Sequence, residues 1–204
     1  MTLKYIMDKY QLEEAPVIKM HCSRKVTFPR ILRRCGLNLG VEVGVERGVF
    51  SSILFKVHPG LKLYGVDAWQ EYAGYRDHVK QDRLDEFFRS TKSRMKGLNF
   101  EPIREFSIKA ARRFEDESLD FVFIDAAHDY DSVKEDIAAW APKVRKDGIV
   151  SGHDYMNLNH TDQDGMVTPY GVKQAVNEWV DQNNIKPLFV LKKDKCPSWF
   201  YVKT

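Results

Sequence analysis

The segment 39–52, LGVEVGVERGVFSS, constrains the fold of this chain more than any other. It begins with an apolar, valine-rich run, which is typical of a strand buried on both faces of a parallel sheet. Gly44 and Gly48 follow this strand, and a helix is predicted from Val49 to Val57. Glycine lets a ligand approach the backbone closely, and a helix N-terminus presents free N–H groups and a positive dipole end. We therefore expect this turn to form part of a ligand site.

The spacing of the glycines argues against a dinucleotide ligand. A dinucleotide site requires G-x-G-x-x-G, but Glu46 stands two positions after Gly44, so the glycine that admits a pyrophosphate is missing. The next predicted strand, 61–66, ends at Asp67, where a carboxylate can accept hydrogen bonds from both hydroxyls of a ribose. Together these features predict a nucleoside ligand without a pyrophosphate.

These residues resemble two motifs of the class I S-adenosylmethionine-dependent methyltransferases. E-x-G-x-x-x-G, formed by Glu42, Gly44 and Gly48, is similar to the first motif, and GVDAW at 65–69 is similar to the second. The resemblance implies S-adenosylmethionine as the cofactor. It further implies that Glu42 orients the methionine end, that Gly44 and Gly48 line the cradle, and that Asp67 holds the ribose.

Three more residues are expected near the cofactor. Trp69 is expected to stack near the adenine, although a position in the core or in a substrate loop explains it equally well. Ser107 follows the third predicted strand and can reach the adenine region, although capping of the next helix also explains it. Asp125 ends the fourth predicted strand and is expected to face both cofactor and substrate.

Strands and helices alternate along the chain, and helices are indicated by spacings such as Val133, Ile137 and Trp140. Five strand-helix units followed by a C-terminal hairpin predict a doubly wound α/β fold with a seven-stranded mixed sheet, parallel except for the hairpin. The predicted strands are 39–45, 61–66, 100–103, 119–124, 149–152, 188–191 and 199–202. The predicted helices cover 3–12, 28–35, 49–57, 77–95, 107–114, 133–140 and 172–180.

The resemblance becomes narrower at the fourth and fifth strands. The segments IDAAHDYDSVKEDIAAW (124–140) and DGIVSGHDY (147–155) are similar to small-molecule O-methyltransferases, in which these strands end in I-D-x-x-H-x-Y and H-D. The similarity runs from residue 39 to the C-terminus, about four-fifths of the chain. It implies transfer of a methyl group to a hydroxyl of a small molecule.

Four titratable residues, Asp125, His128, His153 and Asp154, follow adjacent predicted strands, where ligands bind in open α/β sheets. Methyl transfer to a hydroxyl requires removal of its proton, and His128 is the first candidate for the general base, with His153 second. By resemblance, Asp125 and Asp154 can instead hold Mg²⁺, which would lower the pKa of the substrate hydroxyl. Relatives of that kind commonly carry an extra acid, which this chain lacks near Ala127, so both routes stay open.

The acceptor is expected among the segments 72–75 and 156–169 and the N-terminal residues. The stretch Asp162-x-Asp164-Gly165 lacks the other ligands of a calcium loop, so a lid is the better interpretation. Aromatic and polar side chains in these segments favour a sugar-like or phenolic acceptor over a lipid. They are Tyr72, Tyr75, Tyr155, Asn157, Asn159, His160 and Tyr170.

Composition limits the remaining possibilities. The chain has 204 residues, 43% of them hydrophobic and 30% charged, which indicates a methyltransferase-like domain from 39 to 204 preceded by a helical lid or oligomer segment at 1–38. Three cysteines without C-x-x-C spacing and the lack of a long apolar run favour a cytoplasmic protein without a membrane segment. Residues 1–40 carry eight Lys/Arg against three Asp/Glu, but this end lacks the dense basic and aromatic pattern of a nucleic-acid site.

Two alternatives belong to other functional classes. A non-catalytic module would keep the cofactor cradle while lacking a working base. An NAD-dependent oxidoreductase would require dinucleotide binding, which the missing glycine disfavours.

Overall fold

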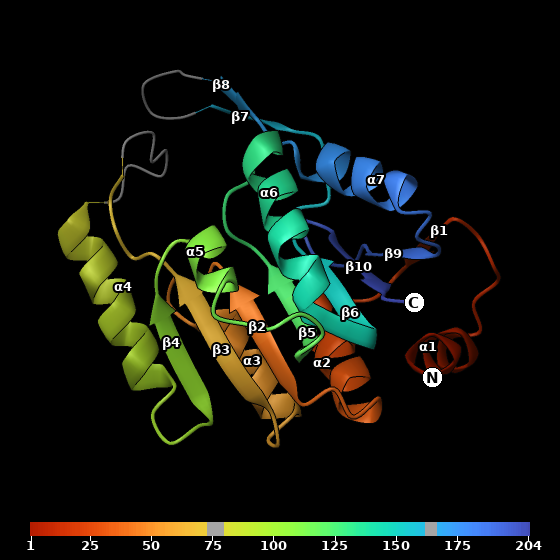
Figure 1. Ribbon diagram of the computed structural model, residues 1–204, viewed down its shortest axis with the longest axis horizontal. Helices are drawn as coiled ribbons and strands as arrows, with labels where there is room; N and C mark the ends of the chain where they lie inside the picture. Colours follow the sequence, from red (N-terminus) through yellow and green to blue (C-terminus); the bar gives the residue numbers. More distant parts are fainter. Residues whose placement is uncertain (73–79, 162–166) are drawn as a thin grey trace.

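Residues 1–72, 80–161 and 167–204 are described by a computed structural model (Figure 1). The strands are β1 (Val17–Met20), β2 (Leu39–Val43), β3 (Lys62–Asp67), β4 (Phe100–Arg104), β5 (Leu119–Ile124), β6 (Val144–Gly152), β7 (Asn159–Thr161), β8 (Val167–Pro169), β9 (Leu188–Leu191) and β10 (Ser198–Val202). The helices are α1 (Thr2–Tyr10), α2 (Arg24–Arg34), α3 (Val49–Val57), α4 (Gln81–Arg94), α5 (Ser107–Ala111), α6 (Tyr130–Trp140) and α7 (Val172–Gln182), with a short 3₁₀ helix at Ala141–Lys143.

Eight strands form one sheet in the order β1-β9-β10-β6-β5-β2-β3-β4, and β7 and β8 form a separate antiparallel pair. Strand β2 lies inside the sheet, parallel to both of its neighbours, β3 and β5. Strand β10 is antiparallel to β6 and β9, which confirms the predicted hairpin. Pro102 lies in β4 at the edge of the sheet, where its missing N–H donor costs no ladder hydrogen bond.

Helices cover both faces of this sheet, with α5, α6 and α7 in front and α2 and α3 behind in Figure 1. Strand β5 contacts the helices on both faces of the sheet, because its successive side chains point to opposite faces. Val122 and Ile124 pack in the core under α5, α6 and α7, whereas Phe121 and Phe123 pack in the core with α2 and α3. The predicted doubly wound α/β architecture is confirmed.

The sheet has one strand more than the sequence predicted, because Val17–Met20 pairs in parallel with β9. Ile18 and Met20 are buried while Val17 and Lys19 are exposed, so the segment alternates as an edge strand does. Four residues were too few for this alternation to stand out beside Pro16. Residues 1–38 thus supply a strand and the packed helix α2, and a role for them as a lid or in an oligomer stays a prediction.

Several element boundaries differ from those predicted. Helix α2 begins at Arg24 rather than near Pro29, because the Ser23 hydroxyl accepts a hydrogen bond from the Lys25 N–H and caps the helix. The pair Asp147-Gly148 lies within β6 instead of preceding it as a turn, and Asp147 has a positive φ there. The expected start of α4 at residue 77 falls outside the described residues.

Within the described ranges, no helix combines the length and the apolar character needed to cross a membrane.

Candidate active site

The turn between β2 and α3 forms the first half of the site. Gly44 and Gly48 both have positive φ, a conformation that other residues rarely adopt. A Cβ atom on Gly44 would overlap the backbone carbonyl of Asp125, so only glycine lets this turn lie against the end of β5. The two ends of neighbouring parallel strands are therefore in direct contact here.

Glu42 lies in the middle of β2 with its side chain buried. The Ser51 hydroxyl of α3 donates a hydrogen bond to its carboxyl group. Burial raises the pKa of Glu42 to about 8, although the Ser51 hydrogen bond acts in the opposite direction. Glu42 is therefore mostly protonated at neutral pH in this structure.

Asp67 at the end of β3 holds the turn in shape. Its Oδ2 accepts hydrogen bonds from the backbone N–H groups of Val45 and Glu46 at 3.0 and 2.9 Å, and its Oδ1 accepts one from Trp69 at 2.9 Å. A carboxylate has about four acceptor positions, so about one remains for a ligand. The ribose contact expected from the sequence stays a prediction, and it would have to form beside these three bonds.

Trp69 and Ser107 both form hydrogen bonds with other residues of the chain, and a cofactor contact of Ser107 stays a prediction. Trp69 is 1% exposed, and its indole N–H donates to the carbonyl of Glu46 at 2.8 Å, so in this structure it cannot stack on an adenine. The Ser107 hydroxyl donates to Asp136 and accepts from the Trp140 indole at 2.9 Å. Ser107 does not cap α5 with its side chain, because this hydroxyl is used to join α5 to α6.

The second half of the site is a cluster formed by Asp125, His128 and Asp154, which follow β5 and β6. One potential ligand atom from each residue lies within 4.8 Å of the other two. Nε2 of His128 is 3.0 Å from Asp154 Oδ2 and 3.8 Å from Asp125 Oδ1. This nitrogen is buried, yet it forms no well-aligned hydrogen bond within the described residues, so its attraction to the acids is ionic.

The cluster strongly favours a positive charge at its centre. Burial acts to lower the pKa of His128, but the carboxylates of Asp125 and Asp154 outweigh burial and raise the pKa to about 10. Burial acts to raise the pKa values of both aspartates, but His128, together with Arg24 beside Asp125, holds them below the ordinary range. At neutral pH two carboxylates therefore enclose an imidazolium.

Arg24 completes the cluster, and the sequence did not single it out. Its Nη1 lies 2.9 Å from Asp125 Oδ2, and its guanidinium lies 4.8 Å from the ring centre of Phe50. An arginine in the first turn of a helix opposes the helix dipole, which is the one local sign that a distant acid holds it. The side chain is only 14% exposed. With Arg24 and protonated His128, the two aspartates are fully neutralised.

His153 and Tyr170 lie beside this cluster. Nδ1 of His153 is 2.9 Å from the Ser198 hydroxyl, and burial lowers its pKa, so this imidazole is neutral at neutral pH. The ring of Tyr170 stacks on His128 with centroids 4.8 Å apart. The structure thus brings together all four titratable residues that the sequence proposed: Asp125, His128, His153 and Asp154.

The expected acceptor residues are only partly described. Tyr155 is half-buried, and its hydroxyl donates to Asn177 at 2.5 Å. Tyr72 packs edge-on against Phe106, with centroids 5.4 Å apart, and Asn157 is exposed. Tyr75 and the stretch with Asp162, Asp164 and Gly165 lie outside the described residues.

The sequence profile of a family described as a methyltransferase domain matches residues 41–155, more than half of the chain. The chain belongs to this methyltransferase domain family. The resemblance to class I S-adenosylmethionine-dependent methyltransferases is therefore confirmed. A search among curated proteins found no sequence match.

Solved structures with the same fold include several methyltransferases at low sequence identity. A proposed caffeoyl-CoA O-methyltransferase from Staphylococcus aureus is 14% identical, with a TM-score of 0.61 over 98% of this chain and 90% of that chain. An S-adenosylmethionine-dependent O-methyltransferase from Thermotoga maritima is 10% identical, with a TM-score of 0.58 over 100% and 71%. The 1,6-didemethyltoxoflavin-N1-methyltransferase from Burkholderia thailandensis, solved with S-adenosylhomocysteine, is 12% identical, with a TM-score of 0.55 over 89% and 79%.

The methyltransferase cradle is consistent with a nucleoside cofactor. The residues expected to bind the cofactor lie at or beside the turn between β2 and α3, within the region that matches the family. They are Glu42, Gly44, Gly48 and Asp67. A cationic ligand would suit the buried Glu42 carboxyl, because within the described residues this group accepts a single hydrogen bond, from Ser51.

Proposed function

We propose that this methyltransferase transfers the methyl group of S-adenosylmethionine to a hydroxyl of a small polar molecule. The cluster of Asp125, His128 and Asp154 beside the Gly44 turn is the observation that carries the proposal. A hydroxyl must lose its proton to become a good nucleophile. Charged and titratable side chains beside the cofactor cradle can accept this proton or stabilise the resulting negative charge. A neutral amine acceptor needs no such group, so N-methylation is the weaker candidate.

Four residues are assigned to the cofactor in this proposal. Gly44 and Gly48 provide the close approach, Glu42 receives the amino end, and Asp67 offers its remaining acceptor position to one ribose hydroxyl. S-adenosylmethionine supplies the transferable methyl group on a cationic sulfonium. The protein contributes position and exclusion of water, which are the main requirements of a displacement at carbon.

Asp125, His128 and Asp154 are proposed to hold a divalent cation. The donor set fits, because two carboxylates and one imidazole each offer a ligand atom within 4.8 Å of the other two, and the buried Nε2 of His128 has no aligned hydrogen bond within the described residues. Mg²⁺ prefers oxygen ligands alone, so the nitrogen of His128 favours Mn²⁺ or Zn²⁺ over the Mg²⁺ expected from the sequence. When bound, the cation would lower the pKa of an acceptor hydroxyl.

His128 and His153 have different protonation states and therefore different roles in this proposal. Without a cation, His128 with a pKa of about 10 is protonated and cannot accept a proton at neutral pH. His153 is neutral and is therefore the base available beside the cluster. A cation would have to displace the proton of His128, because an imidazole nitrogen binds a metal only when it is unprotonated.

The acceptor is proposed to be sugar-like or phenolic. Tyr170 stacks on His128, and Tyr155, the residue after Asp154, donates a hydrogen bond to Asn177, which supports an acceptor that carries a ring and polar groups. The O-methyltransferases among the structural neighbours support a hydroxyl acceptor, and the N1-methyltransferase keeps nitrogen as the second possibility.

The test is release of S-adenosylhomocysteine when the chain is offered phenols and sugars, before and after EDTA and with Mn²⁺ or Mg²⁺ restored. Turnover lost with EDTA and restored best by Mn²⁺ supports both parts of the proposal. Turnover unaffected by EDTA would contradict the cation site. Activity found only on proteins or nucleic acids would contradict the acceptor class.

Replacing His128 separates an enzyme from a cofactor-binding module without catalysis. We expect His128→Ala to lower turnover by about 100-fold while S-adenosylmethionine still binds in calorimetry, because the variant lacks one ligand of the proposed cation. His21→Ala, at an exposed histidine, is the matched control. Binding with no turnover by the parent on any acceptor favours the module, and stabilisation by NAD but not by S-adenosylmethionine would favour an oxidoreductase.

A further inference from the structure

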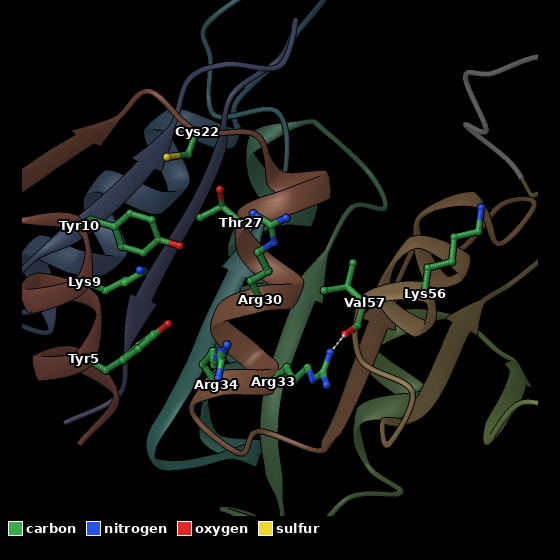
Figure 2. A pocket seen from close by; sticks show the side chains of 10 residues that line it. All are labelled: Tyr5, Lys9, Tyr10, Cys22, Thr27, Arg30, Arg33, Arg34, Lys56 and Val57. Atoms are coloured by element: carbon green, nitrogen blue, oxygen red, sulfur yellow. Dashed lines mark hydrogen bonds between the residues drawn. The ribbon is translucent and has the colours of Figure 1, made fainter.

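A second concave site lies away from the catalytic cluster, in a groove over the surface of α2 (Figure 2). Its volume is about 920 Å³, which is within the range of small-molecule sites. Helix α1 contributes one wall and the end of α3 contributes the other, with α2 between them in Figure 2. We define the basic groove by its lining residues Tyr5, Lys9, Tyr10, Cys22, Thr27, Arg30, Arg33, Arg34, Lys56 and Val57.

The lining of the basic groove has an unusual charge. Five of its ten residues are lysine or arginine, and none is an acid. Lys9, Arg30, Arg34 and Lys56 are exposed, and none of them has an acidic partner at ion-pair distance in the described part of the chain. Like charges gathered in a concave surface repel one another and focus a positive potential there. Such a groove favours an anion strongly.

The remaining lining residues fix the shape and offer neutral contacts. Arg33 donates a hydrogen bond to the carbonyl of Val57 at 3.2 Å, which joins α2 to the end of α3 (Figure 2). The rings of Tyr5 and Tyr10 are half-buried on α1, and Thr27 is buried on α2. The groove can thus hold a ring as well as charged groups.

The basic groove is separate from the methyl-transfer site. Arg24, at the first turn of α2, contacts Asp125, whereas Arg34 is the last residue of the same helix. Ten residues of helix separate them by about 15 Å along the axis. Cys22 and Thr27 line the end of the groove nearer to Arg24, whereas its three arginines lie toward the other end of α2.

We propose that the basic groove binds a phosphate-bearing small molecule. Guanidinium groups match phosphate oxygens in a bidentate geometry, and the groove offers three arginines and two lysines. A membrane surface is flat and would not reach into a concave groove. A nucleic acid would need a basic surface that continues beyond the groove, whereas the chain as a whole carries a net charge of only +3.

Calorimetry with inorganic triphosphate tests this proposal. The parent chain is expected to bind, with an affinity that falls as salt rises. Arg30→Gln/Arg34→Gln should weaken binding by about tenfold to 100-fold, because each of the two lost charged hydrogen bonds contributes up to about a factor of ten. Arg89→Gln/Arg112→Gln removes the same charge from exposed arginines outside the groove and should change affinity less than about twofold.

Arg30→Lys/Arg34→Lys keeps the charge but removes the planar forks, and intermediate affinity is expected. Equal melting temperatures for all variants exclude misfolding as the cause. No binding by the parent, or equal weakening by the control pair, would overturn the proposal. If oligothymidylate binds more tightly than triphosphate, with an affinity that rises with its length, the proposal is overturned in favour of a nucleic acid. If only phosphatidylserine vesicles bind, it is overturned in favour of a membrane surface.

Discussion

Glu42 shows how one buried acid links stability to pH. Its pKa is about 8 in the folded chain against an ordinary value of 4.5, so folding takes up a proton between these two values. A raised acid pKa means that stability falls as pH rises through this window and then becomes level above it. The total loss is about 5 kcal/mol at most.

We expect Glu42→Gln to remove most of this pH dependence, because glutamine stays neutral and still offers an oxygen to Ser51. Urea unfolding between about pH 5 and about pH 9 measures it. Glu46→Gln, at an exposed acid on the same turn, serves as the control. If the free energy of unfolding falls over this pH range by the same amount in the parent as in Glu42→Gln, Glu42 is not uncharged in the folded chain.

Asp67 is expected to stabilise the chain even without a cofactor. Asp67→Ala leaves three backbone N–H groups without their acceptor, which should lower the free energy of unfolding by about 2–3 kcal/mol. Binding of S-adenosylmethionine should weaken as well, since the turn shapes the cradle. Denaturation measures the first effect and calorimetry the second. Unchanged stability with weakened binding would show that the carboxylate serves the ligand alone.

At the scale of elements, the N-terminus of α2 depends on a residue far away in the sequence. Asp194, in the turn between β9 and β10, accepts hydrogen bonds from the Arg24 N–H at 2.7 Å and from the Ser23 hydroxyl at 2.8 Å. This carboxylate caps the helix whose first residue contacts Asp125. The turn therefore supports both α2 and the position of Arg24.

Asp194→Ala should lower the free energy of unfolding by about 1–2 kcal/mol, because the cap is lost, whereas Asp194→Asn should retain more of it. The exposed neighbour Lys195→Ala is the control. Equal stability of all three variants in urea would show that α2 does not need this cap.

Asp194 and Arg24 show which parts of the structure could be predicted from the sequence and which could not. Buried strands and the acids at their ends follow local rules, so β2, β5 and the residues Asp125 and Asp154 were found. The Asp194 cap and the Arg24 contact join residues more than 100 positions apart, and no local pattern reports such a pair. Trp69 was ambiguous for a different reason, since an aromatic after a strand suits either a ligand or a core.

At the scale of the whole molecule, residues 1–38 belong to the same folded unit as the methyltransferase match. Ile6, Ile18 and Met20 share a core with Phe121 and Phe200 on the sheet. Strand β1 also covers the edge of β9, which would otherwise present free backbone groups. A destabilising mutation in β1 should therefore lower the free energy of unfolding of the whole chain.

Ile18→Ala tests this unity, because Ile18 is 7% exposed and Val17 beside it is 41% exposed. Deleting a buried isoleucine side chain should lower the free energy of unfolding by about 2–3 kcal/mol, with one transition for the whole chain. Val17→Ala, on the open face of the same strand, should cost less than about 1 kcal/mol. Tryptophan fluorescence follows the unfolding, because Trp69, Trp140 and Trp199 all lie outside residues 1–38. If Ile18→Ala leaves this transition unchanged, β1 is a loosely attached segment and a lid at 1–38 becomes the better interpretation.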